Sequence, residues 1–368
     1  MKGTKAKCSV WLGLVLTLLV VPNARAVLFV ATDDPSYNTN APTGSLANSG
    51  WQYEGQWGLY LGTPIAPTFF IAAQHIGGSA GQPFVLNGFT YTTVTNFDDP
   101  GTDLRIWQVA QTFPYYAPLY TGSDEVGQPC VAVGRGTQRG SLVSVNGPTN
   151  GWMWSTSDHV QRWGQNTVAG VYTNGGDDLL LYANFELNGM TNECDLSPGD
   201  SSGGLFIQNG STWQLAGVHY SVSGPFSFDG SSADEFNAAV VDQRGLYFED
   251  CDGGCWTLVP TNYPVAVPGA FYSTRVSSRI SWISSVINYN LGNDLGILGI
   301  KIVGSDVQIS LLTGSNRYYR VDYTTNLVNA TWMTLTNNIP GTTGPVTVVD
   351  SGVATNQPSR FYRATVLP

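Results

Sequence analysis

The sequence predicts an all-β protein, and three observations support this fold class. The chain has 43 glycines, 20 prolines and an aromatic fraction of 12%, as expected for many short strands joined by turns. Turn signals such as Asn87-Gly88 and Asp99-Pro100-Gly101 recur, and helical periodicity is almost absent before residue 270. Between the turns lie β-rich runs: Trp57–Leu61, Thr68–Ala72, Thr90–Val94, Leu104–Val109, Cys130–Val133, Leu179–Ala183, Gly204–Gln208 and Gln214–Tyr220.

The carboxyl-terminal third starts with one predicted helix, at Arg275–Ile287. Its apolar residues Val276, Ile280, Ile283 and Ile287 recur at spacings of four, three and four, which forms one helical stripe. Residues 297–368 then contain no cysteine or histidine. Their alternation and strand number predict a small β-sandwich, and the Asn- and Gly-rich stretch before it is typical of a linker. We expect catalysis not to need this module.

Residues 1–26 have the features of a cleaved signal peptide. Three lysines precede an apolar run, Val10–Val21, and Ala24-Arg25-Ala26 provides the small-x-small pattern that a signal peptidase recognises. The run is short for a membrane span, so cleavage is favoured over a retained anchor. We therefore expect residues 27–290 to form the first mature domain and the protein to be secreted or periplasmic.

Charge and cysteine content narrow the function classes. The net charge is −10, with 26 acidic and 16 basic residues, so the chain lacks the basic surface of a nucleic-acid-binding protein. After signal removal four cysteines remain, an even number that suggests two disulfides in an exported chain. Three pairings are possible; Cys251 could close locally on Cys255, which would leave Cys130 with Cys194. The spacing disfavours zinc, and no metal or other cofactor is expected.

The candidate general base is one of only three histidines. His75 follows the apolar run Phe69–Ala73 and precedes Gly77-Gly78, which places an imidazole at the end of a buried strand. Asp103 precedes the strand Leu104–Val109, where it could hold an imidazole in one tautomer. Taken alone, each has an ordinary alternative: a buried structural histidine and a turn aspartate.

The candidate nucleophile lies in the small-residue segment Pro198–Gly204. Small residues allow a sharp turn that exposes a hydroxyl, and consecutive backbone amides can converge on a developing oxyanion. This composition is common in β proteins, so its meaning depends on the segments around it.

Together these segments resemble the trypsin/chymotrypsin family of serine proteases, in its secreted bacterial form. Ala72-Ala73-Gln74-His75 is similar to the family's Thr-Ala-Ala-His, and Gly199-Asp200-Ser201-Ser202-Gly203-Gly204 is similar to its Gly-Asp-Ser-Gly-Gly. Thr102–Ile106 resembles the family's Asp-Ile-Ala-Leu, and the order His, Asp, Ser is the family order. The resemblance covers roughly residues 50 to 290.

The resemblance implies two six-stranded β-barrels with a C-terminal helix and a site in the cleft between the barrels. His75, Asp103 and Ser201 would be the catalytic triad, and the amides of Gly199 and Ser201 the oxyanion hole. The substrate would be a protein or peptide, hydrolysed through an acyl-enzyme. The C-terminal residues resemble small β-sandwich modules appended to exported bacterial proteins.

Three departures from the family pattern leave questions open. Ser202 stands where the family has glycine, so Ser202 is a second candidate for the nucleophile. Ile76 replaces a cysteine after the histidine. The family's Ile-Val-Gly-Gly start is absent, so Asp200 needs another partner, such as an arginine.

Two residues give conflicting indications of substrate specificity. Asp195 lies six residues before Ser201, where trypsin-like members hold a carboxylate that binds Lys or Arg. His219 lies where glutamate-specific bacterial members hold a pocket histidine. The alternative function is an inactive protease-like protein that binds a surface or a carbohydrate. A glycosidase would need two carboxylates facing across a cleft, and the sequence singles out no such pair.

Overall fold

The computed structural model describes residues 27–145, 147–176, 178–251, 254–291, 296–313, 317–328, 331–342, 345–355 and 359–367. The predicted signal peptide, residues 1–26, lies outside the described residues. Within the ranges given, no helix is both long enough and apolar enough to cross a membrane.

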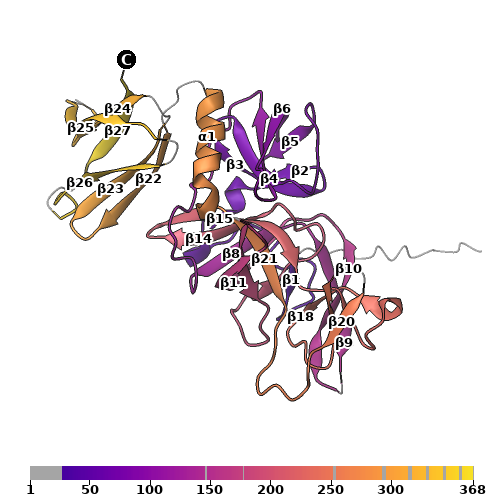
Figure 1. Ribbon diagram of the computed structural model, residues 1–368. Helices are drawn as coiled ribbons and strands as arrows, with labels where there is room; N and C mark the ends of the chain where they lie inside the picture. Colours follow the sequence, from indigo (N-terminus) through magenta and orange to yellow (C-terminus); the bar gives the residue numbers. More distant parts are fainter. Residues whose placement is uncertain are drawn as a thin grey trace, which may run out of the picture.

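The first barrel is closed and antiparallel, in the order β2-β3-β4-β7-β6-β5 (Figure 1). Its interior is filled by aromatic side chains, among which Phe70 and Phe84 stack with ring centroids 4.1 Å apart. Because side chains alternate across a strand, each run supplies one inward row for this core. The six strands are β2 (Gly55–Trp57), β3 (Tyr60–Ala66), β4 (Phe69–Ala73), β5 (Pro83–Leu86), β6 (Phe89–Asp98) and β7 (Leu104–Val109).

The second barrel is also closed, in the order β11-β12-β21-β15-β14-β8. The prediction of two six-stranded barrels is therefore confirmed. The strands of the second barrel are β8 (Pro129–Gly134), β11 (Arg162–Thr173), β12 (Leu179–Asn184), β14 (Gly204–Asn209), β15 (Thr212–Val222) and β21 (Ala270–Arg275).

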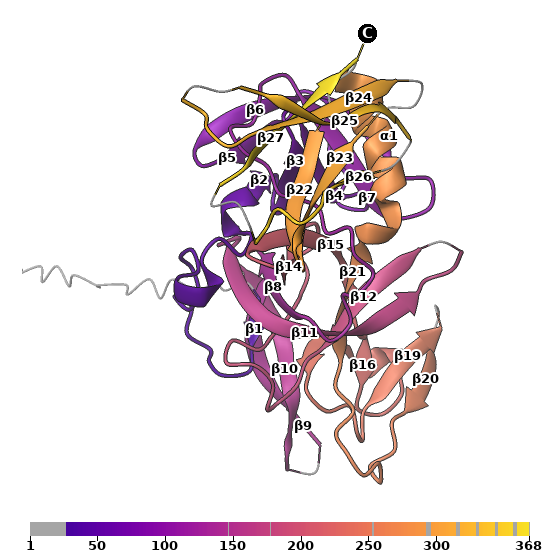
Figure 2. The same cartoon turned by 90° about the vertical axis from the view of Figure 1, so that its left-hand side faces the viewer.

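Two insertions enlarge the second barrel, and the sequence analysis did not foresee them. The hairpin β9–β10 leaves the barrel after β8 and pairs with β18, which belongs to the long segment between β15 and β21. Together they form an extension at the end of the molecule away from the carboxyl terminus (Figures 1 and 2). Its strands are β9 (Thr137–Ser144), β10 (Thr149–Ser157), β16 (Phe226–Ser227), β17 (Glu235–Phe236), β18 (Ala238–Val240), β19 (Tyr247–Cys251) and β20 (Cys255–Leu258).

The first described residues add a short strand beside the segment that leads to Ser201. Strand β1 (Leu28–Phe29) pairs with β13 (Cys194–Asp195), Leu28 opposite Asp195. Both β1 residues are buried, so the segment is part of the second barrel's core. The remaining short elements are 3-10 turns at Gly44–Leu46, Trp51–Tyr53, Ser232–Asp234 and Ser277–Arg279.

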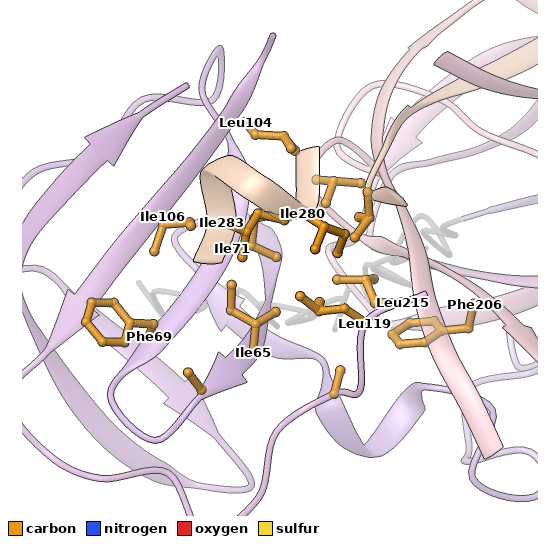
Figure 3. Packing of buried hydrophobic residues seen from close by; sticks show 14 of the residues in the cluster. Ile65, Phe69, Ile71, Leu104, Ile106, Leu119, Phe206, Leu215, Ile280 and Ile283 are labelled. Carbon is orange, nitrogen blue, oxygen red and sulfur yellow. The ribbon is translucent and has the colours of Figure 1, made fainter. Parts of the chain in front are cut away.

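The helix α1 (Ile280–Leu291) begins five residues later than the sequence predicted. Arg275 is instead the last residue of β21, which pairs with both β12 and β15 and so closes the second barrel. Ser277–Arg279 form a 3-10 turn before the helix. Ile280 and Ile283 then pack against Ile71 and Leu104 of the first barrel and Leu215 of the second (Figure 3). The predicted apolar stripe is therefore the seam between the barrels.

The C-terminal β-sandwich consists of two three-stranded sheets, β22-β23-β26 and β25-β24-β27. Its core lies between the sheets and includes Ile309, Tyr319 and Val321. Leu312 of the sandwich belongs instead to the cluster that joins α1 and the barrels, and the partly buried Leu298 packs against the same cluster. The strands are β22 (Gly296–Val303), β23 (Asp306–Leu312), β24 (Tyr318–Thr324), β25 (Met333–Pro340), β26 (Val346–Asp350) and β27 (Phe361–Val366).

The suggested disulfide between Cys130 and Cys194 is wrong. Both are free thiols in the buried core of the second barrel. The Cys130 thiol donates to the carbonyl of Asn166 at 3.2 Å, and burial raises the pKa of both thiols. Cys255 is disulfide-bonded; the side chain of Cys251, its expected partner, lies outside the described residues.

Candidate active site

The first barrel presents His75 and Asp103 together. Strand β4 is buried along its whole length between β3 and β7, and His75 follows two residues after its end. The imidazole Nδ1 lies 2.6 Å from Oδ2 of Asp103, and the backbone N–H of His75 donates to Oδ1 at 2.9 Å. A carboxylate only accepts, so Nδ1 carries the proton and Nε2 is left with its lone pair.

Two neighbouring aspartates, Asp98 and Asp99, are engaged elsewhere. Asp98 accepts from Arg105 at 2.5 Å, and Asp99 forms an ion pair with Arg279 at the start of α1. The hydrogen bond from Arg105 lowers the pKa of Asp98, so this carboxylate stays ionised. Of the three acids before β7, only Asp103 contacts the His75 ring.

The second barrel presents the loop Pro198–Gly204, which turns sharply before β14. Gly199 has φ +100°, a conformation that glycine adopts without steric cost. Ser202 has φ +71° and is completely buried, and its Oγ accepts the backbone N–H of Ala73 at 3.0 Å. This bond ties the loop to the strand that carries His75, and it turns the Ser202 hydroxyl away from solvent.

Two backbone amides of this loop have no acceptor within the described chain. Asp200, Ser202 and Gly203 donate to carbonyls of Ser197, His219 and Asp200. No such bond is made by the amides of Gly199 and Ser201, the two that the resemblance assigns to an oxyanion hole. These amides remain free to bind a negatively charged oxygen.

Asp200 is held by uncharged donors rather than by an arginine. Its buried carboxyl accepts from the N–H of Gly136 at 2.6 Å and from the N–H and hydroxyl of Ser197, both at 2.9 Å. Burial raises its pKa to about 7, although these bonds and the more distant Arg162 oppose the shift. Arg162 itself forms an ion pair with Asp158 at 2.8 Å. The expectation of an arginine partner is therefore not met.

Ser201 lies at a pocket of about 300 Å³. The Tyr220 ring, which also lines the pocket, contacts the His75 ring edge to face with centroids 5.9 Å apart. Tyr220 thus touches both the His75 ring and the pocket that Ser201 lines. The lining residues are Trp154, Leu196, Ser197, Pro198, Ser201, His219, Tyr220, Ser221 and Val222.

The two residues suggested for specificity are placed differently. His219 lines the pocket, but its ring is buried, and Nδ1 lies 2.9 Å from the hydroxyl of Ser273. Burial lowers the pKa of His219 to about 3, so its ring is neutral. Asp195 does not line the pocket; it lies in β13 under β1, where its carboxyl accepts the N–H of Leu196.

Sequence reasoning missed Trp154, the one pocket residue that comes from the β9–β10 hairpin. Nothing local in the sequence distinguishes it from the other ten tryptophans. His159, the third histidine, bonds with Ser157 at 3.1 Å and is not in this pocket. Among the described residues, no group of three or more His, Cys, Asp or Glu side chains is placed to hold a metal ion.

Comparison with known proteins gives only distant structural similarities. No family model matches the chain, and no curated protein matches it. The Rv3671c protease in its inactive form is 15% identical with a TM-score of 0.33, over 56% of this chain and 91% of that one. The HtrA-type protease AlgW with a decapeptide is 13% identical with a TM-score of 0.37, over 65% and 56%.

A third similar structure is the NS6 protease from murine norovirus 1, 17% identical with a TM-score of 0.30 over 55% of this chain and 93% of that one. All three are described as proteases. At these scores the similarities carry no argument about activity, and the assignment of fold class rests on the two closed six-stranded barrels.

Proposed function

We propose that the chain is a serine endopeptidase that hydrolyses peptide bonds through an acyl-enzyme. The observation that carries the proposal is the 2.6 Å hydrogen bond between His75 and Asp103, beside a pocket lined by Ser201. A histidine oriented by a carboxylate, with a serine nearby, is the arrangement that converts a weak hydroxyl nucleophile into a strong one.

In the first half-reaction, Oγ of Ser201 attacks the peptide carbonyl carbon while Nε2 of His75 takes the hydroxyl proton. Asp103 keeps accepting the hydrogen bond from Nδ1 of His75 and stabilises the imidazolium. The carbonyl oxygen becomes an oxyanion, to which the free amides of Gly199 and Ser201 donate. When the C–N bond breaks, the imidazolium gives its proton to the leaving amine.

In the second half-reaction, water repeats the attack on the ester. His75 takes a proton from the water, and the ester C–O bond breaks as His75 returns the proton to Ser201. The free enzyme structure contains no hydrogen bond between His75 and Ser201 among the bonds of the described residues. Such catalytic bonds often tighten only when substrate binds.

Secretion is part of the proposal and rests on the sequence of residues 1–26. The oxidising compartment this implies is compatible with the two free thiols, since both are buried in an apolar core. Sequencing the amino terminus of protein recovered from the culture medium should give Val27.

The deciding experiment is labelling with a fluorophosphonate, followed by mapping of the modified residue. Ser201 should be labelled, and Ser201→Ala should lose both labelling and peptide hydrolysis. Ser202→Ala is the matched control, because the buried Ser202 hydroxyl bonds Ala73 and should not react. A label on Ser202 would move the nucleophile. Folded protein with no label on either serine would support the alternative of an inactive binding protein.

A further inference from the structure

The pocket beside Ser201 decides which side chain the enzyme accepts before the cleaved bond, the P1 residue. Its walls are mainly apolar: Trp154, Leu196, Pro198 and Val222. The polar groups are hydroxyls, the phenol of Tyr220 and the imidazole of His219. A site of about 300 Å³ lined in this way has the dimensions of a pocket for one side chain.

None of the residues lining the pocket carries a formal charge. His219 is the only titratable group that could become cationic, and burial lowers its pKa to about 3. Its Nδ1 already interacts with Ser273. Behind it lies the fully buried ring of Phe271, edge to face with the imidazole at a centroid distance of 5.9 Å.

Asp195 does not supply the missing charge. It is 3% exposed, it lies on β13 paired with β1, and burial raises its pKa to about 8, so it is largely protonated at neutral pH. The neighbouring Leu196, and not Asp195, faces the pocket. A lysine or arginine side chain entering the pocket would lose its water without gaining a charged partner, which is unfavourable.

We infer that the pocket accepts an uncharged, apolar P1 side chain and that Trp154 of the β9–β10 hairpin is a specificity-determining wall. This rests on the proposed endopeptidase function and names its substrate class. Burying a Leu, Met or Phe side chain in such a pocket gains about 1.5–3 kcal/mol, or roughly 10- to 150-fold.

Trp154 lines the pocket and also contacts the second insertion of the second barrel. Its backbone N–H donates to the carbonyl of Asn237 at 3.0 Å, so the segment between β15 and β21 holds β10 in place. The same segment follows directly on Val222, the last residue of β15, which also lines the pocket. One insertion thus supplies a pocket residue, and the other supports it.

The test compares full-length protein on peptides that differ only at P1, with Leu, Met or Phe against Lys, Arg, Asp or Glu. We expect kcat/KM for the best apolar peptide to exceed that for every charged one by about 100-fold or more. Equal or faster cleavage after Lys or Arg would overturn the inference, as would preference for Glu, which would identify His219 as an anion donor.

A variant pair tests the wall. Trp154→Ala should reduce kcat/KM for the Leu peptide by about 10-fold and change the Phe-to-Leu ratio, since the pocket widens. Leu142→Ala is the matched control: Leu142 is exposed on β9 of the same hairpin and should leave the P1 profile unchanged. An unchanged P1 profile in Trp154→Ala would show that Trp154 does not determine specificity.

The two proposals can fail separately. Fluorophosphonate labelling of Ser201 does not depend on P1. If Ser201 is labelled but charged peptides are preferred, the apolar inference is wrong while the endopeptidase proposal stands. If folded protein is not labelled and cleaves none of the peptides, the proposed function itself is wrong.

Discussion

The acids beside the histidine and the acids beside the nucleophile loop lie in different surroundings. In the first barrel, Asp98 pairs with Arg105 and Asp103 with His75, both near the surface. In the second barrel, Asp195 and Asp200 are buried near the nucleophile loop, and burial raises their pKa values to about 8 and about 7. The acids near His75 therefore pair with nitrogen donors of other side chains, whereas those near Ser201 act as buried acceptors of backbone N–H groups.

This difference fits the separate roles proposed for the two barrels, one carrying the general base and the other the nucleophile. A general base needs one defined tautomer, which a charged partner provides. A nucleophile loop needs a fixed backbone, which neutral acceptors buried among N–H groups can provide. The second barrel also carries all the insertions, so shape recognition is concentrated there and proton transfer in the first.

The largest expected effect tests the hydrogen-bonded pair of the first barrel, His75 and Asp103. His75→Ala and Asp103→Asn should each lower kcat about 10⁴-fold, because the amide favours the wrong tautomer and alanine removes the base. Combining either with Ser201→Ala should cost little more, since the three residues act as a unit. Peptide hydrolysis measures this.

Asp99→Asn is the matched control for that pair, because Asp99 bonds Arg279 and not His75. Its kcat should remain within a few-fold. A normal kcat in Asp103→Asn would show that another acid orients the histidine.

The next largest expected effect concerns the packing of the C-terminal sandwich against the barrels. Leu312 of β23 lies in the cluster shared by α1 and the barrels, although Ile309 of the same strand lies in the sandwich core. Leu312→Ala should destabilise the barrels by about 2–5 kcal/mol, because a cavity opens in their seam. Thermal unfolding, with peptide hydrolysis as the readout for the barrels, measures this.

Ile309→Ala is its control and should lower only the stability of the sandwich. The sequence alone predicts that a chain ending near Asn293 folds and keeps its kcat/KM within a few-fold. The packing of Leu312 in the seam argues against that prediction, and a negligible effect of Leu312→Ala on the barrels would support it. A large effect would mean that the sandwich completes the barrels' core.

The third prediction concerns the buried acids of the second barrel. Asp195 has a folded-state pKa of about 8 against an ordinary value of 3.8, so the folded protein binds an extra proton between these values. Its contribution is fully present below about pH 4 and is lost as pH rises through about 8. Asp195→Asn should therefore gain about 1–3 kcal/mol relative to wild type between about pH 5 and about pH 8.

Urea unfolding at the two pH values provides the measurement. Asp98→Asn is the first-barrel control: hydrogen bonding to Arg105 lowers the pKa of Asp98, so its carboxylate is ionised at both values and the variant should change stability equally. If the stability of both variants relative to wild type changed with pH in the same way, the contrast between Asp195 and Asp98 would be wrong.

The smallest effect tests the bond that joins the barrels. Ser202→Gly and Ser202→Ala both remove the 3.0 Å bond to Ala73, and glycine also suits the φ of +71°. We expect kcat to fall about 10-fold with little change in KM, because the loop loses its register against His75. An equal rise in KM with unchanged kcat would instead mean that Ser202 affects substrate binding alone.

The sequence by itself determined much of this architecture, for local reasons. The continuous apolar run Phe69–Ala73 specifies a strand buried on both faces. Apolar residues that recur between polar ones specify the strand Leu104–Val109. The stripe of Ile280, Ile283 and Ile287 likewise specified a helix face. The candidate residues His75, Asp103 and Ser201 stood out only together, because their three segments resemble, in order, those of a known protease family.

Tertiary structure alone decided the rest, since those features depend on segments far apart in the chain. Ser202 is separated from Ala73 by 129 positions, and no local pattern shows that its hydroxyl is used. Asp195 has the spacing of a specificity carboxylate, yet it is buried on β13 beside β1 and does not line the pocket. Trp154 becomes a pocket wall only because β10 pairs with β18. Burial and pairing across the fold, which sequence spacing does not encode, fix what each of these side chains contacts.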